Sequence, residues 1–350
     1  MIAKPATGAD ACHAVAEMHH RLVTGTILSL ILRCGEATAA EAVFRTYRRQ
    51  HGEKFLAGLE LLRLDQLPPA VASAQYHYLS NFIGTVRVEY IYESDRKAWI
   101  RYPPPRWIFD GAAICGVPDS ITMAMLRGWH ARNGAALGNS RLGFVCTGMT
   151  TAGDPGLEGY FLEHDRPLTP EERLRFAPDE CAPPFDAAAA PTLATVDWTP
   201  LRLAKAERNY AMDLARALQA ETAGLLGEGE TRKVAGHAAR LVGLQFYDAT
   251  RRMLGTGGAS AAEFAAYLCA VGEAMGDAPQ MREENGDIVI EQAACRILRG
   301  LADPSPAIFE AWRELWQGAC AAHDRRLSLT AEPAGVTGDS AWRWRISDRT

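Results

Sequence analysis

The sequence lacks the features that mark proteins for nucleic acids or membranes. Its 350 residues carry 37 basic and 42 acidic side chains, and no block of Lys or Arg is long enough to neutralise several phosphates. The longest mainly apolar stretch, Leu22 to Leu32, is interrupted by small polar residues and falls short of the roughly 20 residues that a membrane span requires. The first ten residues lack the apolar stretch of a signal peptide. We therefore expect a cytoplasmic protein that binds neither nucleic acid nor membrane.

Motifs for metals, nucleotides and common nucleophiles are also missing. The 8 cysteines include no Cys-x-x-Cys pair, and the 9 histidines show no zinc-type spacing. There is no glycine-rich phosphate loop and no Gly-x-Ser-x-Gly sequence. Scattered cysteines in a chain of this length are usually reduced and buried. These absences predict a protein without a metal or cofactor and leave a small molecule as the expected partner.

The chain repeats itself at a separation of about 190 residues. The matching pairs, in chain order, are Val43 with Val234, Phe55 with Phe246, Tyr76 with Tyr267, Ile100 with Ile290, Arg106 with Arg296, Trp129 with Trp316, and Arg141-Leu142 with Arg326-Leu327. The separation shrinks slowly along the chain, as small loop deletions in one copy would produce. Because solenoid repeats run about 20 to 50 residues, a repeat of this length indicates a duplicated domain.

A proline-rich segment separates the two copies. Prolines recur from Pro167 to Pro200, and proline blocks the interiors of both helices and strands. We therefore expect a first repeat over residues 1–165, a linker over 166–202 and a second repeat over 203–350. The two repeats would be related by a pseudo-two-fold axis and pack like an internal homodimer. The sequence does not fix the oligomeric state and leaves a true homodimer open.

Hydrophobic periodicity predicts an α+β fold in each copy, with N-terminal helices, an antiparallel β-hairpin, a further helix and a second β-hairpin. In the first copy the expected helices cover 14–33, 38–62, 69–82 and 119–137, and the expected strands cover 85–93, 97–101, 141–147 and 158–163. In the second copy the expected helices cover 203–226, 230–254, 260–275 and 305–323, and the expected strands cover 280–284, 287–292, 326–330 and 341–347.

Each copy closes on Gly-Asp followed by alternating aromatic residues. These positions are Gly153-Asp154 with Tyr160-Phe161, and Gly338-Asp339 with Trp342 and Trp344. In this order the chain resembles the ligand-binding superfamily of the 4-vinyl-reductase domains, the vesicle-tethering transport-particle subunits and the L-2-amino-thiazoline-4-carboxylic acid hydrolase-like proteins. Members of the hydrolase-like group read Cys-Pro after the second strand; here Tyr102-Pro103 stands at that place, and Cys295 lies near it in the second copy. The resemblance covers most of both copies and implies a small-molecule hydrolase or binding protein.

The first copy keeps polar residues where the second copy has others. His130 and Asn133 are three residues apart, which places them on one face of a helix. A neutral imidazole is a suitable general base near neutral pH, and an amide can orient it or hold a substrate carbonyl. Cys146, on the following strand, becomes a nucleophile if a nearby base or positive charge lowers its pKa. The alternative is a helix histidine without a function and a cysteine in the core.

Aromatic and basic residues near the first hairpin are candidates for substrate binding. Arg101 can clamp a carboxylate in bidentate fashion. Tyr90, Tyr102 and Trp129 can form the walls of a small pocket, although packing of a strand face explains them equally well. The remaining candidates lie on a Gly/Pro-rich loop and on early helices: Cys115, His20 and His51. For the two histidines a solvated helix face is the alternative.

Together these features predict a hydrolase that cleaves a C–N or C–S bond of a small heterocyclic or amide substrate carrying a carboxylate. In this hypothesis His130 activates water or Cys146, Asn133 positions the carbonyl group, and Arg101 holds the carboxylate. The alternative is a non-catalytic sensor, carrier or assembly protein of the same superfamily. A pocket closed by its own side chains favours that alternative, and a water-accessible cavity with His130 in it favours the enzyme. A tetrapyrrole-related role like that of the 4-vinyl-reductase domains is a third hypothesis.

Overall fold

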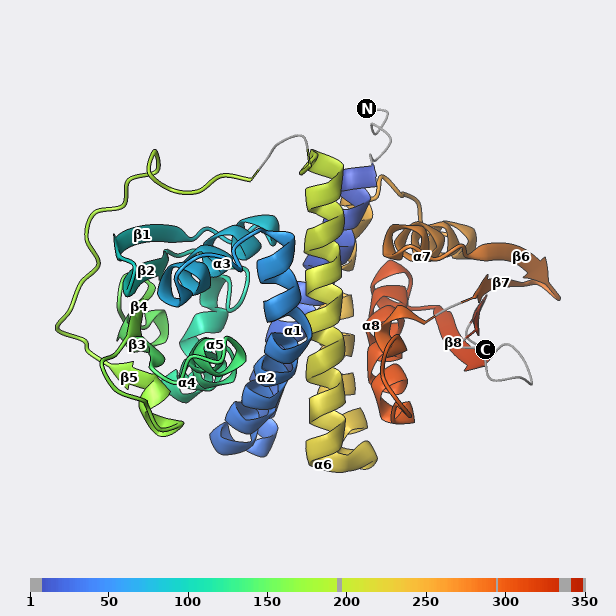
Figure 1. Cartoon of the computed structure of the whole chain (residues 1–350). Helices are drawn as coiled ribbons and strands as arrows, with labels where there is room; N and C mark the ends of the chain where they lie inside the picture. Colours follow the sequence, from blue (N-terminus) through green and yellow to red (C-terminus); the bar gives the residue numbers. More distant parts are fainter. Residues whose placement is uncertain (1–7, 194–196, 294, 334–340, 349–350) are drawn as a thin grey trace. The chain divides into compact units, whose positions relative to one another are not determined.

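A computed structural model describes residues 8–193, 197–293, 295–333 and 341–348 of the chain (Figure 1). It is an α+β structure with two β-sheets, as the sequence predicts. Its contacts define two compact units: a central unit, Cys34–Thr199, and a terminal unit, Met1–Arg33 with Pro200–Thr350. This division differs from the predicted boundaries at 1–165, 166–202 and 203–350. The N-terminal helix belongs with the terminal unit, and the proline-rich segment belongs with the central one.

The central unit is built from helices, one five-stranded sheet and short 3₁₀ turns. Its helices are α2 (Glu36–Leu61), α3 (Pro69–Ile83), α4 (Asp119–Gly128) and α5 (Asn133–Ala136). Its strands are β1 (Glu89–Ser94), β2 (Lys97–Tyr102), β3 (Leu142–Gly148), β4 (Leu157–Glu163) and β5 (Leu174–Phe176). Its turns are η1 (Gly111–Gly116), η2 (His130–Arg132), η3 (Thr150–Ala152) and η4 (Glu171–Arg173). The strand order is β1-β2-β4-β3-β5.

Both faces of the central sheet are covered. Successive residues of a strand point to opposite faces, so Ile100 and Phe161 pack toward α3 while Trp99 and Tyr160 pack on the other side. The second face meets the proline-rich segment at Ala177, and Figure 1 shows this segment running along the outside of the sheet. The segment begins by adding β5 parallel to β3, a strand that the sequence analysis did not predict. The predicted linker is therefore part of the central fold.

The helix predicted over 119–137 is broken in the structure. Helix α4 ends at Gly128, Trp129 leaves helical geometry, and the chain continues as η2 and α5. A Cβ atom at Gly128 would lie 2.8 Å from the carbonyl oxygen of Phe44, so α4 approaches α2 more closely than a larger residue allows. At Gly134 a Cβ atom would lie 2.4 Å from the carbonyl oxygen of Leu142. Both close approaches lie in the segment that carries the predicted site, and a larger side chain at either glycine would clash with its neighbour.

The terminal unit repeats much of this order. Its helices are α1 (Gly8–Cys34), α6 (Pro200–Met253), α7 (Ala261–Met275) and α8 (Pro306–His323). Its strands are β6 (Gln280–Glu284), β7 (Asp287–Gln292), β8 (Leu327–Pro333) and β9 (Trp342–Asp348), with η5 (Arg296–Leu298) after β7. The sheet order is β6-β7-β9-β8, which is the order of the first four strands of the central sheet. The predicted Gly338-Asp339 turn lies outside the described residues.

Helix α6 contains both of the long helices predicted for the second copy. They meet at Gly227, whose φ of 74° and ψ of 171° are not helical. Small side chains bring α1 against this helix: a Cβ atom on Gly25 would lie 2.9 Å from the Val242 side chain, and Ser29 Oγ donates to the Val234 carbonyl at 2.9 Å. These contacts explain why the N-terminal helix belongs to the terminal unit. Among the described residues no helix is both long and apolar enough to cross a membrane.

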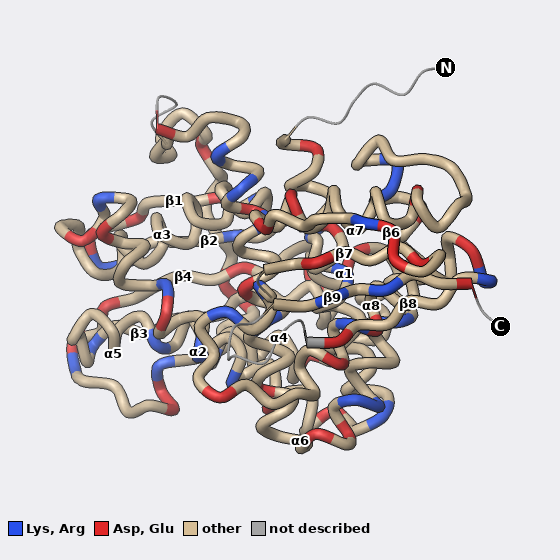
Figure 2. Tube along the Cα trace, turned by 90° about the vertical axis from the view of Figure 1, so that its right-hand side faces the viewer, with Lys and Arg blue, Asp and Glu red and all other residues tan. Residues whose placement is uncertain are grey.

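The terminal sheet carries paired charges on its outward side. Arg343 donates to Glu291 at 3.0 Å, and Arg345 donates to Asp287 at 2.9 Å. Figure 2 shows basic and acidic residues interspersed along β6, β7, β9 and β8. This alternation leaves no extended patch of one sign on the sheet.

Candidate functional site

Five buried polar side chains meet inside the central unit. They come from five different elements, α2, α3, β2, η2 and α5, and are His51, His77, Tyr102, His130 and Asn133. We call this set the histidine cluster. The imidazole rings of His77 and His130 stack at 4.1 Å between centroids, and aromatic rings of the core surround the cluster. Four of these five residues were predicted site residues, and the broken helix is what brings His130 and Asn133 to the others.

The three histidines of the cluster are neutral near pH 7. Burial, followed by the nearby charge of Arg132, lowers the pKa of His51 to about 4. Burial lowers the pKa of His77 to about 3. Burial, followed by the neighbouring His77 and the charge of Arg106, holds the pKa of His130 well below its usual value. A neutral imidazole has one nitrogen that donates and one that accepts, so the partners of each ring fix its tautomer.

The hydrogen bonds of the cluster form one chain. His51 Nε2 donates to Asn133 Oδ1 at 3.1 Å, and Asn133 Nδ2 donates to His77 Nε2 at 3.5 Å. His77 then carries its proton on Nδ1, which donates to the Tyr102 hydroxyl oxygen at 3.0 Å. The Tyr102 hydroxyl lies 3.5 Å from His130 Nε2, where either group can be the donor. His130 Nδ1 is buried and has no hydrogen-bond partner among the described residues.

The hydrogen bonding of His130 bears on its predicted role as a general base. A base needs a free lone pair, and Nδ1 offers one when His130 Nε2 donates to Tyr102 but not when Tyr102 donates to Nε2. The exposed fraction of His130 is 9%, so water has little access to the ring. The cluster as a whole is a polar core whose members position one another.

Two other predicted residues are engaged with protein groups. Cys146 donates from Sγ to the Gly148 carbonyl at 3.4 Å, and burial raises its pKa to about 12, so the thiolate required of a nucleophile is not populated at neutral pH. Arg101 donates from Nε to Glu89 at 2.6 Å and lies 3.7 Å from Glu158. A substrate carboxylate would have to displace these acids.

The remaining predicted residues lie apart from the cluster or beside it. Trp129 packs against His51, with ring centroids 5.6 Å apart. Tyr90 is a buried residue of β1 whose hydroxyl accepts from Gln75 at 3.3 Å. Cys115 is exposed on η1, and His20 lies on α1 in the terminal unit. The structure therefore gathers His51, Tyr102, Trp129, His130 and Asn133, and places Tyr90, Cys115 and His20 elsewhere.

His77 is the cluster member that the sequence analysis did not propose as a site residue. It links the two ends of the chain of hydrogen bonds, since it accepts from Asn133 and donates to Tyr102. One signal pointed to it: at the repeat separation of Tyr76 and Tyr267, His77 falls on the apolar Leu268.

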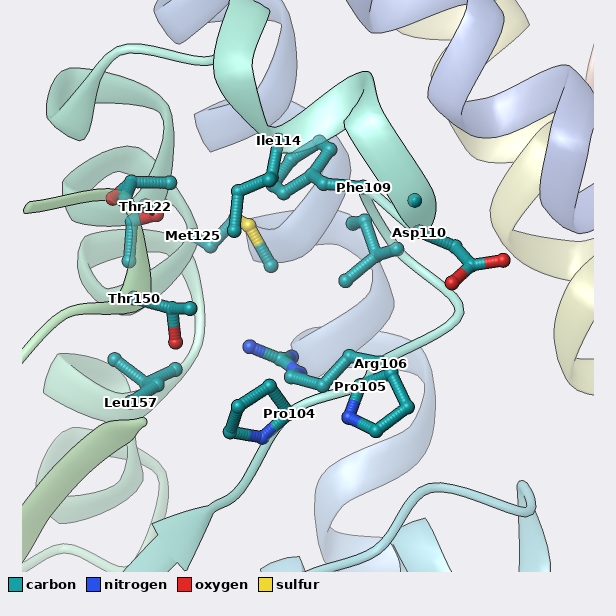
Figure 3. Close-up of a pocket in the computed structure, with 13 residues that line it drawn as sticks. Pro104, Pro105, Arg106, Phe109, Asp110, Ile114, Thr122, Met125, Thr150 and Leu157 are labelled. Atoms are coloured by element: carbon teal, nitrogen blue, oxygen red, sulfur yellow. Dashed lines mark hydrogen bonds between the residues drawn. The ribbon is translucent and has the colours of Figure 1, made fainter. Parts of the chain in front are cut away.

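A cavity of about 310 Å³ lies beside the cluster in the central unit (Figure 3). Its apolar lining comes from the loop after β2, from η1, α4 and β4: Pro104, Pro105, Ile108, Phe109, Ile114, Met125 and Leu157. Its polar lining is Arg106, Asp110, Thr122, Thr150 and Thr151. Small-molecule sites are typically of this kind, mostly apolar with a few polar groups that fix orientation.

Arg106 connects the cavity to the histidine cluster. Its guanidinium carbon lies 4.9 Å from the centroid of the Tyr102 ring, and its charge is one cause of the low pKa of His130. Figure 3 shows the side chain of Arg106 extending into the cavity, whereas the carboxyl group of Asp110 points away from it. Arg106 Nε and Thr150 Oγ1 are buried and have no hydrogen-bond partner among the described residues.

The described residues contain no group of three His, Cys, Asp or Glu side chains arranged to hold a metal ion. In the histidine cluster the rings of His77 and His130 stack face to face, so their nitrogens do not converge on one point. The sequence matches no protein-family model, and comparisons with curated proteins and with solved structures find no match.

Proposed function

We propose that the central unit binds a small molecule in the cavity lined by Arg106, Met125 and Thr150, and serves as a sensor, carrier or assembly protein. The observation that carries this proposal is the cavity itself, at about 310 Å³ within the size range of ligand sites. In the terminal unit one described void beside the sheet is about 10 Å³ and is lined by Leu268, Trp316 and their neighbours. Of these two described voids, the one in the central unit has room for a ligand.

A duplication of a half-length ancestor fits this difference. The shared strand order β1-β2-β4-β3 and β6-β7-β9-β8 supports such an origin, as does the ordered series of matching residues. On this proposal one copy kept the cavity and the other became structural. Membership of the L-2-amino-thiazoline-4-carboxylic acid hydrolase-like family, a cytoplasmic location and a homodimer all remain predictions.

The proposed binding is tested by filling the cavity. Ile114, on η1, lines the cavity, and Ile114→Trp would occupy much of it. Ala112 lies on the same turn but is exposed, so Ala112→Trp adds the same ring outside the cavity. In a ¹⁹F NMR screen of small fragments, we expect hits that bind the wild-type chain and Ala112→Trp but lose binding to Ile114→Trp. Fragments that bind Ile114→Trp as well as wild type would contradict the proposal.

Hydrolysis of a carboxylate-bearing cyclic amide or thiazoline is the second candidate. One observation favours it: His130 Nδ1 is buried and has no hydrogen-bond partner among the described residues. When this atom carries the proton of the ring, it can stabilise the oxyanion that develops as water attacks a carbonyl or imine carbon, so His130 would act as a donor in place of the predicted base. The test is turnover of 2-thiazoline-4-carboxylate and 5-oxoproline, monitored by NMR. Turnover that His130→Phe abolishes supports this candidate; no turnover by the folded wild-type chain removes it.

A further inference from the structure

We propose that the cavity recognises a single carboxylate on an otherwise apolar small molecule, with the Arg106 guanidinium and the Thr150 hydroxyl as its anchor. This inference rests on the proposed function of the cavity as a binding site, and it specifies the chemical class of the ligand. The anchor differs from the predicted carboxylate clamp, Arg101, which is engaged with Glu89 and Glu158.

Two residues that line the cavity each carry a polar atom without a protein partner. Arg106 Nε and Thr150 Oγ1 are both buried, and neither has a hydrogen bond among the described residues. Leaving a buried polar group unsatisfied costs about 1 to 3 kcal/mol, and more for a charged group. An acceptor placed between a guanidinium and a hydroxyl satisfies both, and a carboxylate has two oxygens that accept hydrogen bonds.

The charges around Arg106 leave it without a protein counter-ion. Asp110 lines the cavity, but its carboxyl group points away (Figure 3). Asp154, near Thr150 in the chain, accepts a hydrogen bond from the Met149 amide at 2.7 Å. Arg106 is the only cationic side chain among the described residues that line the cavity. One cation in a mostly apolar cavity matches a ligand with one negative charge better than a doubly charged phosphate.

The matching arginine of the other copy is bonded to the protein. Arg296 donates from Nη1 to the Met275 carbonyl at 2.7 Å and from Nη2 to Asn209 Oδ1 at 2.5 Å. The same residue type at matching positions is thus satisfied internally in one unit and left open to a ligand in the other. This contrast indicates that the unsatisfied state of Arg106 is particular to the unit with the cavity.

The histidine cluster holds the anchor in place. The hydroxyl of Tyr102 is bonded to His77 and to His130, which fixes the ring over which the Arg106 guanidinium lies. A guanidinium stacked on a fixed ring loses less conformational freedom when it binds a ligand. The cluster therefore acts through Arg106, and its members are positioning residues.

The experiment compares a carboxylate with its neutral amide. We would titrate 4-fluorobenzoate and 4-fluorobenzamide into the full chain and measure Kd by ¹⁹F NMR. Wild type should bind 4-fluorobenzoate more tightly, and Arg106→Gln should raise its Kd about 10- to 100-fold, the range for a charged hydrogen bond, while changing the amide less than about 3-fold. Thr150→Val should raise the benzoate Kd about 2- to 10-fold. Arg127→Gln, on an exposed position of α4, is the matched control and should change neither.

The possible outcomes distinguish an error in the proposed Arg106–Thr150 anchor from an error in the proposed binding cavity. If Ile114→Trp abolishes binding of both probes but Arg106→Gln weakens them equally or not at all, the anchor is wrong and the binding site stands. If both probes bind Ile114→Trp as they bind wild type, or neither binds wild type, the proposed function itself fails. Inorganic phosphate that displaces 4-fluorobenzoate at equal concentration would overturn the assignment to a monocarboxylate. Circular dichroism of each variant confirms that it is folded.

Discussion

In the central unit, the space between sheet and helices holds three neutral histidines, an asparagine and a tyrosine, while in the terminal unit the matching space holds tryptophans. Trp312 and Trp316 are almost completely buried, with rings 5.4 Å apart, and Trp344 of β9 packs against Trp312. Burial of apolar rings stabilises a fold directly, whereas buried polar groups contribute only when each is satisfied. The comparison teaches that one strand order supports both a stabilising interior and an interior arranged to position side chains.

The sheet faces that point away from the helices also differ between the two units. The central sheet is covered by the proline-rich segment, so Trp99 and Tyr160 are buried there. The terminal sheet carries Arg and Glu pairs on its outward side and needs no cover. Tyr102, at the end of β2, therefore lies in a sheet that is buried on both faces.

The largest expected effect on stability comes from removing a tryptophan from the interior of the terminal unit. Trp312→Ala should lower the free energy of unfolding by about 3 to 5 kcal/mol, because it leaves a large cavity in a packed core and removes a donor to His19 Nε2. Urea unfolding followed by circular dichroism measures the change. Leu241→Ala, at an exposed position of α6, is the control and should change it by less than about 0.5 kcal/mol. A loss below about 1 kcal/mol for Trp312→Ala would contradict a stabilising role for this interior.

A smaller loss is expected when the polar interior is given the terminal unit's residue. His77→Leu removes the acceptor of Asn133 and the donor to Tyr102, and should cost about 1 to 3 kcal/mol of unfolding free energy. Adding Tyr102→Phe removes the hydroxyl that lost His77 together with its hydrogen bond to His130, so the double variant should cost less than the sum of the two single variants. The same urea experiment measures both variants. If the double variant loses as much unfolding free energy as the two single variants together, the two residues are not coupled through the cluster.

The sequence predicted the type and order of most elements. Alternating and helical periods set β6 and β7 to the residue and most of the helices to within a few residues. Strand β5 was missed because its three residues lie in a proline-rich segment and pair only with a distant strand. The break after α4 was missed because Gly128 and Gly134 act through close contacts with α2 and β3, which local periodicity does not contain.

The candidate site was predicted only in part, because some of its contacts depend on the tertiary structure. Comparing the two copies singled out His130, Asn133 and His51, which fall on Gln317, Cys320 and Val242 of the other copy. The sequence could not show that Arg101 pairs with Glu89, because that contact depends on the register of β1 and β2. It also could not show that Arg106 is unsatisfied, since that depends on the direction of every neighbouring side chain.

Acid should weaken the cluster in a defined pH range. The folded state keeps His77 neutral down to a pKa of about 3, while the unfolded state takes up a proton near pH 6.5. Stability is therefore unaffected by His77 above pH 6.5 and falls as the pH drops below it, by about 1.4 kcal/mol per pH unit for each such histidine. Between pH 6.5 and 5.5, His77→Leu should lose about 1 kcal/mol less than wild type in urea unfolding, because the unfolded histidine is already half protonated at pH 6.5. Equal losses in the two proteins would show that His77 has the same pKa in the folded and unfolded states.

The smallest expected effect compares the two matched arginines. Arg296→Gln removes hydrogen bonds to the Met275 carbonyl and to Asn209, and should cost about 1 to 3 kcal/mol of unfolding free energy. Arg106→Gln removes no hydrogen bond to the described protein and loses only the contact with the Tyr102 ring, so its cost should be about 0.5 to 1 kcal/mol. Urea unfolding of both variants without ligand measures the difference. An equal or greater cost for Arg106→Gln would mean that Arg106 supports the fold, since a residue kept for a ligand contributes little stability in its absence.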